Sequence, residues 1–319
     1  MPRRPARRRA RKEVALVPVV LDTDIGTDID DTWALAMLLR CPELDLRLVT
    51  ASTGDPEYRA RLVAGILDAG GRSDVPVALG VAGGGAAGAP QQAFAAGIDL
   101  AGHPGGVRSD GAAAIIDCVN SSADPVTILS IGPAGTVAAA LAADPGIAAS
   151  ARFVGMHGSV RIGYGAGSAP EAEYNVLSDV PAFRAVLAAP WEVTITPLDT
   201  CGSVVLRGER YASLHASQDP LVRAVMLNYR QWLEAVGQIE LYRERTTTLF
   251  DTVAVYLAYA EDLVDIEELD IVVDDDGRLR VDPEGRRLRA ATAWHDPEAF
   301  ADHVVQRLTG TSPGPVEGR

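Results

Sequence analysis

The chain has 319 residues, 47% of them hydrophobic, so it is long and apolar enough to bury a large core. Its formal net charge of −14 at pH 7 argues against nucleic acid and anionic membranes as partners of the folded body. Three cysteines, at positions 41, 118 and 201, are odd in number and lack metal-ligand spacing. We expect reduced thiols in a cytoplasmic protein.

Basic residues are concentrated at the start of the chain, where six arginines and Lys12 lie within the first twelve positions. The apolar run at 14–21 is short, lacks a small-residue cleavage site and leads into an acidic motif, so it does not fit a signal peptide. No stretch is long enough to span a bilayer. We predict a disordered basic arm at 1–13, one domain at 14–310 and a flexible tail at 311–319.

The most informative stretch joins an apolar strand at 19–21 to an apolar helix at 32–39. Five aspartates lie on it: Asp22, Asp24, Asp28, Asp30 and Asp31. A loop that follows a buried strand lies at the carboxyl edge of the sheet, where open α/β proteins bind ligands. Crowded carboxylates repel one another in a low dielectric, and a bound cation relieves the repulsion. Oxygen ligands favour Ca²⁺ or Mg²⁺.

Three other interpretations of the acidic loop compete with a cation site. A helix N-cap needs only one aspartate. An EF-hand loop does not fit, because Trp33 stands where the closing glutamate belongs. A phosphatase of the haloacid dehalogenase type also places Asp-x-Asp after a strand, but its phosphate needs a basic partner. Because no lysine follows Lys12, only an arginine could serve, and this alternative stays the weaker one.

The rest of the chain alternates between predicted strands and predicted helices. Strands are predicted at 46–52, 75–79, 126–131 and 193–199, with a further strand end at 153–158, and helices at 61–67, 112–119, 137–143 and 179–187. This rhythm predicts an α/β fold with a mostly parallel, Rossmann-like central sheet and flanking helices. Residues 80–106 are predicted to form a long surface loop, with His103 as a surface side chain.

The last third is predicted to contain helices at 211–215 and 221–236. A hairpin follows, in which the turn Asp276-Gly277 joins strands at 269–273 and 278–281. A strand at 290–294 and a helix at 297–308 close the fold.

The acidic run resembles the Asp-Thr-Asp-x-Gly-x-Asp-Asp signature of the nucleoside hydrolases, with two residues inserted before the final Asp pair. Further similarities follow in order at 172–175, 197–199 and 251–254, so the resemblance covers about 19–308. It implies the nucleoside hydrolase fold, of the inosine-uridine preferring type. The implied reaction is calcium-dependent hydrolysis of the N-glycosidic bond of a ribonucleoside, which releases base and ribose.

The resemblance implies a calcium site. Asp24 would bind Ca²⁺ and deprotonate water, and Asp31 and Asp251 would be further carboxylate ligands. Gly135 stands where the family has a threonine whose backbone carbonyl binds calcium, and a glycine keeps that carbonyl. Asp22 would support the loop, whereas the inserted Asp28 has no counterpart.

The resemblance also implies a set of substrate-binding residues: Asp30, Asp55, Glu173, Asn175, Gln238 and Tyr242. Asp30, Glu173 and Asn175 would bind ribose hydroxyls, although a Glu and an Asn at a helix start can equally be caps. Gln238 and Tyr242, with Arg243, lie on a segment that flanks the base pocket in the family. We expect a small-molecule nucleoside as the partner and a homodimer or homotetramer as the assembly.

Several positions depart from the family pattern. Asp55 replaces an asparagine, Gly167 stands where a second ribose asparagine is expected, and His157 enters a Met-Gly-Gly turn. Phe250 replaces a histidine that helps the leaving base depart, and Gln238, Tyr242, Arg243, His103 and His157 are the remaining candidate donors. These departures keep one alternative open, a nucleoside-binding protein without turnover.

Overall fold

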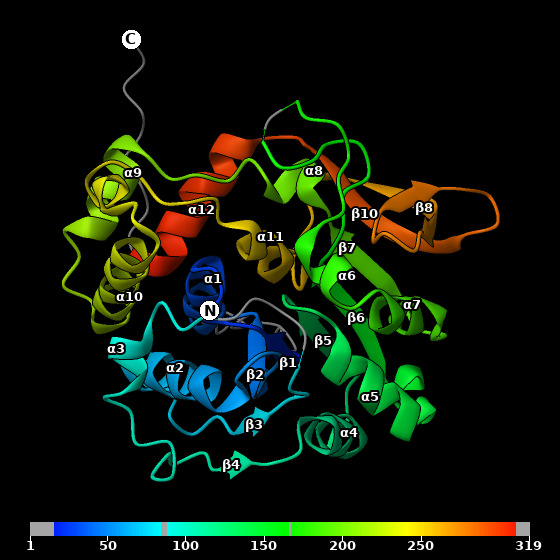
Figure 1. The fold of residues 1–319 in the computed structure, drawn as a ribbon, viewed down its shortest axis with the longest axis horizontal. Helices are drawn as coiled ribbons and strands as arrows, with labels where there is room; N and C mark the ends of the chain where they lie inside the picture. The colour runs from blue at the N-terminus through cyan, green and yellow to red at the C-terminus, as the bar shows by residue number, and fades with distance from the viewer. Residues whose placement is uncertain (1–15, 84–87, 166, 311–319) are drawn as a thin grey trace, which may run out of the picture.

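The computed structural model describes residues 16–83, 88–165 and 167–310. The predicted arm at 1–13 and the predicted tail at 311–319 therefore lie outside the described residues. In the part that is described, every strand belongs to a single sheet, and helices cover both of its faces (Figure 1).

The sheet has ten strands in the order β4-β3-β2-β1-β5-β6-β7-β10-β8-β9. Their bounds are β1 Val17–Thr23, β2 Leu44–Ala51, β3 Val77–Leu79, β4 Val107–Arg108, β5 Val126–Ser130, β6 Ala151–Met156, β7 Val193–Thr196, β8 Val264–Val273, β9 Leu279–Val281 and β10 Arg286–Trp294. All neighbours from β4 to β10 pair in parallel, and β8 runs antiparallel to both β10 and β9. The predicted mostly parallel sheet is confirmed.

Twelve α-helices are described. They are α1 Asp30–Leu39, α2 Pro56–Ala69, α3 Gln92–Ala95, α4 Gly111–Ser121, α5 Gly135–Ala143, α6 Tyr174–Ser178, α7 Val180–Ala188, α8 Leu198–Cys201, α9 Gly208–His215, α10 Pro220–Val236, α11 Phe250–Leu257 and α12 Pro297–Thr309. Two short 3₁₀ helices, η1 Pro145–Ala149 and η2 Ile239–Arg243, lie between them.

Strand β1 occupies the middle of the sheet because it is apolar on both faces. Val19 and Leu21 pack into one core with α1, α2, α10, α11 and α12, whereas Val20 packs into a second core with α4, α5 and α7. This alternation is expected of a strand with helices on both sides. It brings the acidic loop after β1 to the centre of the carboxyl edge, between the ends of β2 and β5.

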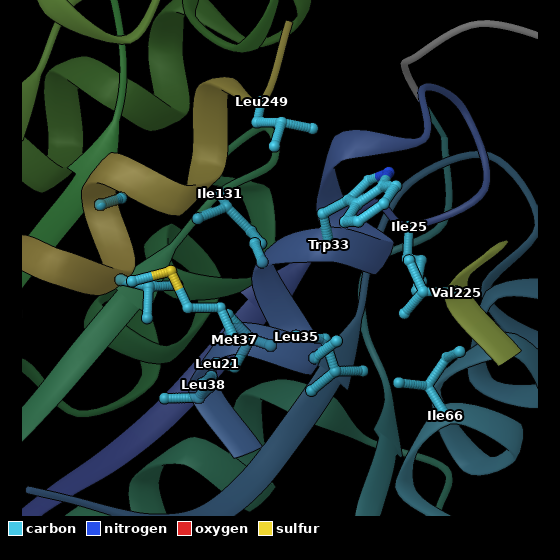
Figure 2. Packing of buried hydrophobic residues seen from close by; sticks show 14 of the residues in the cluster. Leu21, Ile25, Trp33, Leu35, Met37, Leu38, Ile66, Ile131, Val225 and Leu249 are labelled. Carbon is cyan, nitrogen blue, oxygen red and sulfur yellow. The ribbon is translucent and has the colours of Figure 1, made fainter. Parts of the chain in front are cut away.

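Helix α1 carries the last two aspartates of the acidic loop into the interior. Every residue from Asp30 to Leu38 is buried, and the helix packs against α2, α10, α11 and α12. Trp33, Leu35 and Met37 lie among side chains from several other elements in Figure 2. A helix that is apolar all round must be enclosed, so the position of α1 is fixed by its sequence.

The predicted surface loop at 80–106 is only partly irregular. It contains α3, and β4 follows it at the edge of the sheet. The prediction that His103 is a surface side chain is wrong: it is 8% exposed, and its Nε2 lies 2.8 Å from the carbonyl oxygen of Val75. The predicted hairpin is confirmed as β8 and β9, with Gly277 at a φ of +82° in the turn.

His157 follows β6 and is fully buried, with its ring stacked on Phe183 at a centroid distance of 4.6 Å. Burial lowers the pKa of His157 to about 3. The unfolded chain therefore binds a proton at His157 below about pH 6.5 that the folded protein does not bind until about pH 3. Its contribution to stability is consequently lost as the pH falls through this range, by about 1.4 kcal/mol per pH unit.

We predict that His157→Gln removes this acid sensitivity. The quantity to compare is the unfolding free energy of the variant minus that of the parent. This difference should rise by about 2 kcal/mol when the pH is lowered from 7 to 5, whatever its value at pH 7. Urea unfolding at both pH values measures it, with the exposed His215→Gln as the control. A difference that stays constant with pH would show that His157 does not titrate between the folded and unfolded states.

Candidate functional site

A cavity of about 290 Å³ opens at the carboxyl edge of the sheet, beside the acidic loop. It is lined by Asp24, Thr27, Asp28, Asp30, Asp31, Ile131, Met156, Tyr164, Glu173, Tyr174, Asn175, Trp232, Phe250 and Asp251. These residues follow β1, β5 and β6 or belong to α1, α6, α10 and α11. Six of them are carboxylates, brought together from three separate parts of the chain.

Three of the carboxylates form a compact cluster. One oxygen each from Asp30, Asp31 and Asp251 lies within 4.8 Å of the others, and all three side chains are at most 5% exposed. Asp30 and Asp31 begin α1, and Asp251 lies in the first turn of α11, which packs against α1. Burial and the neighbouring negative charges raise the pKa of all three well above the usual range. Hard oxygen ligands at this spacing suit a divalent cation such as Ca²⁺.

Asp24 lies in the same cavity and is 3% exposed. Burial raises its pKa to about 6, and the Arg59 guanidinium partly offsets that rise. Gly132, just after β5, approaches it closely: a Cβ added to Gly132 would lie 2.7 Å from Asp24 Oδ1 and 2.8 Å from the Asp24 nitrogen. The absence of a side chain at this glycine therefore lets the end of β5 pack against the acidic loop.

Hydroxyl groups of Thr50 and Ser52 bind Asp22 near the end of β1, just before the acidic loop. Thr50 Oγ1 donates a hydrogen bond of 2.5 Å to Asp22 Oδ1, and Ser52 Oγ donates to the same oxygen. On the next residue, Thr23 Oγ1 donates to Asp31 Oδ1 and accepts from the Ile25 nitrogen at 3.1 Å. Asp22 does not line the cavity. Its contacts are those of a group that supports the loop, as predicted.

Arg59 is the functional-site neighbour that the sequence analysis missed. It lies on α2, is 2% exposed, and donates from Nε to the Thr53 carbonyl at 2.9 Å and from Nη1 to the carbonyls of Asp24 and Ile25. Its Nη2 donates to Thr27 Oγ1 at 2.8 Å. One buried cation thus fixes the backbone of the acidic loop. The available signal was an arginine in α2, the helix that follows the second strand of the sequence.

Glu173 and Asn175 are placed in the cavity with the aspartates. The Glu173 carboxylate accepts hydrogen bonds from the backbone nitrogens of Gly158, Asn175 and Val176, and burial nevertheless raises its pKa to about 7. Asn175 Nδ2 donates to the carbonyls of Ile131 and Met156, each at 3.1 Å. Glu173 is therefore a helix cap as well as a cavity residue.

Four residues from the predicted site do not line this cavity. Asp55 is the N-cap of α2, where its Oδ1 accepts from the nitrogens of Glu57 and Tyr58, each at 3.1 Å. Gly135 begins α5 and lines a separate cavity. Gln238 is exposed, and Tyr242 packs against the rings of His215 and Tyr229. The roles assigned to these four residues stay predictions.

Two aromatic residues of the cavity, Tyr164 and Trp232, were also not predicted from the sequence. Tyr164, which is 40% exposed, meets Phe250 edge to face at a centroid distance of 6.0 Å. Trp232 of α10 donates from Nε1 to the Thr27 carbonyl at 3.1 Å. Thr27, the inserted Asp28 and this tryptophan all line the cavity. Neither His103 nor His157 lines it.

Comparison with known proteins agrees with this geometry. The family described as inosine-uridine preferring nucleoside hydrolase matches residues 19–305, so the chain belongs to the nucleoside hydrolase family. Members of this class hydrolyse the N-glycosidic bond of ribonucleosides, and the chain is accordingly a hydrolase of such bonds.

Particular relatives can be named. The chain is 30% identical over 220 residues to the pyrimidine-specific ribonucleoside hydrolase RihA of Escherichia coli O139:H28, a match that covers 64% of this chain and 68% of the relative. Its fold resembles the plant nucleoside hydrolase PpNRh1, with a TM-score of 0.78, 20% identity, and 93% and 100% of the two chains covered. It also resembles the purine-preferring ribonucleoside hydrolase from Gardnerella vaginalis, with a TM-score of 0.73, 24% identity, and 92% and 98% covered.

Across the described residues, none of the helices combines the length and the apolar character that crossing a bilayer requires.

We predict that Gly132→Ala lowers catalysis. The new methyl group would lie 2.7 Å from Asp24 Oδ1 and 2.8 Å from the Asp24 backbone nitrogen, so both the loop and its carboxylate must shift. A displacement of about 1 Å at a reacting group costs roughly a hundredfold in rate. Hydrolysis of p-nitrophenyl riboside measures the loss, and Gly97→Ala, whose nearest neighbour atom would lie at 3.5 Å, is the control. Equal activity in the two variants would show that Asp24 is not held by this contact.

Proposed function

We propose that this protein is a calcium-dependent ribonucleoside hydrolase. The observation that carries the proposal is the cluster of Asp30, Asp31 and Asp251, with oxygens within 4.8 Å of one another, in a cavity that also contains Asp24 and Glu173. The reaction passes through an oxocarbenium-like transition state, which nearby carboxylates stabilise. The same cavity therefore offers negative charge, sugar ligands and a base.

The residues fit a metal ion, because crowded and buried carboxylates at this distance repel one another unless a cation or protons lie between them. Asp31 and Asp251 would be its ligands, together with Asp24 and the carbonyl predicted at Gly135. In the structure Asp30 completes the tight cluster, with an oxygen within 4.8 Å of oxygens of Asp31 and Asp251. A calcium ion bound there supplies positive charge beside the attacking water and the ribose hydroxyls.

The protein's own residues then have distinct tasks. Asp24 takes a proton from the attacking water as general base, since its carboxylate lies in the cavity with the acidic cluster. Asp30, Glu173 and Asn175 hold ribose hydroxyls, where hydrogen bonds strengthen as the transition state forms. No further role is proposed for Asp55, Gln238 or Tyr242 beyond the predicted one.

Two alternative functions suggested by the sequence, a phosphatase and a nucleoside-binding protein without turnover, can be distinguished from a hydrolase. Family membership removes the phosphatase alternative, and none of the lining residues among those described is a lysine, arginine or histidine that could meet a phosphate. A nucleoside-binding protein without turnover would bind nucleosides in a thermal-shift assay and release no reducing sugar. Release of ribose from a panel of nucleosides supports the hydrolase. The homo-oligomeric assembly and the cytoplasmic location stay predictions.

We predict that exhaustive chelation lowers both turnover and the melting temperature. An ion bound only by the folded state at a hundred times its Kd stabilises that state by about 2.7 kcal/mol, which corresponds to roughly 5 °C for a chain of this size. Differential scanning fluorimetry with EGTA, then with Ca²⁺ or Mg²⁺ restored, measures the effect and identifies the ion. Asp251→Asn is the matched control, because its melting temperature should no longer respond to chelation. An unchanged parent protein would refute the metal site.

We predict that Asp24→Asn loses roughly a hundredfold or more in kcat, as expected when a general base is removed. Asp28→Asn, in the insertion, should lose much less with p-nitrophenyl riboside, since no catalytic role is assigned to it. Steady-state kinetics of both variants, with circular dichroism as a check on folding, decides the matter. Equal losses at the two positions would show that the insertion has been placed wrongly in the loop. The general base would then be a different aspartate.

A further inference from the structure

The cavity contains one carboxylate that the proposed reaction does not use. Asp28 lines the cavity, follows Thr27, and its Oδ1 accepts a hydrogen bond from the Ile29 nitrogen at 2.6 Å. The carbonyl of Thr27 accepts a hydrogen bond from Trp232 Nε1, so the acidic loop and the tryptophan form one wall. Tyr164 and Phe250 supply two further rings.

The charge of the cavity is one-sided. Its lining contains six carboxylates, and among the described residues it contains no lysine, arginine or histidine. The buried guanidinium of Arg59 lies behind the loop, where its bonds go to backbone carbonyls and to Thr27. A cationic ring is attracted both by carboxylates and by the faces of aromatic side chains.

None of the described residues that line the cavity is a histidine, the side chain that most often protonates a leaving group near neutral pH. Tyr164 does line it, but burial raises the pKa of its hydroxyl, which makes it a weak acid. Phe250 precedes Asp251 and can only offer a ring on which a base stacks. His103 donates from Nε2 to the Val75 carbonyl, and His157 stacks in the core on Phe183. A base that must be protonated before it leaves is poorly served here, whereas a leaving group that already carries positive charge needs no acid.

We propose that the preferred substrates of this site are ribosides of a positively charged N-heterocycle, such as an N-ribosylpyridinium or a 7-methylated purine riboside. Asp28 faces the charged ring, and Trp232, Tyr164 and Phe250 enclose it. The inference rests on the proposed function, because it names the leaving group that the same hydrolytic site accepts.

Hydrolysis of such a cationic riboside needs no general acid. The water oxygen bonds to C1′ as the C1′–N bond breaks, and the bonding electron pair passes to the ring nitrogen. The heterocycle thereby becomes neutral and leaves as such. The proton lost by water goes to Asp24 and then to solvent. The products are ribose, a neutral heterocycle and one proton, and no oxidant or further reactant is needed.

Binding of charge is tested first, with a pair of inhibitors that differ in little else. The cation 1-methylpyridinium-3-carboxamide and the neutral 3-methylbenzamide compete against p-nitrophenyl riboside. We expect the cation to have the lower inhibition constant by about tenfold, the effect of one added charge contact in a partly buried site. In Asp28→Asn this preference should fall to about a third or less of its value. Asp124→Asn, which removes an exposed carboxylate before β5, should keep it.

Turnover is tested with 7-methylinosine and inosine, which share the ribose and the purine skeleton. Methylation alone makes the base leave more easily, so the informative quantity is the change in the kcat/KM ratio on Asp28→Asn. We expect the ratio to fall about tenfold, mainly through KM for the cation. No preference for the cationic inhibitor, or a ratio unchanged by Asp28→Asn, overturns the inference. Failure to cleave p-nitrophenyl riboside at all would instead overturn the proposed function.

Discussion

The repulsion among buried carboxylates at one edge of the sheet is the constraint on which the site depends. Asp24, Asp30, Asp31 and Asp251 are each at most 5% exposed, where negative charges interact strongly. Their pKa values are raised because burial penalises the charged form. Such an arrangement persists only if opposite charge or donors compensate it. The buried Arg59 guanidinium provides part of this compensation, and the proposed cation would provide the rest.

The scaffold makes this crowding tolerable. The loop after β1 is anchored from below by the hydroxyls that bind Asp22 and Asp31, and from the side by Arg59. The two helices that carry the cluster, α1 and α11, pack directly against each other in the interior. Because neither helix can move without disrupting the core, the oxygens are held in position before any ligand binds. Such preorganisation is what electrostatic catalysis requires.

The cavity divides into two chemical halves. The half formed by the aspartates, Glu173 and Asn175 is suited to a sugar, because it presents charged and amide groups to hydroxyls. The half formed by Trp232, Phe250 and Tyr164 is suited to a flat ring. Under the proposed function, catalysis would depend mainly on the carboxylates and specificity on the aromatic rings.

The sequence by itself determined the parallel α/β fold and the acidic loop, because a buried strand and helix around several aspartates have one place in such a sheet. Family resemblance added Asp251, Glu173 and Asn175, which the structure places in the same cavity as that loop. Tertiary structure alone decided that Arg59 supports the loop and that Trp232 joins the cavity. Long-range contacts leave no local signature: an arginine or tryptophan on a helix has the same periodicity whether it meets solvent, core or ligand.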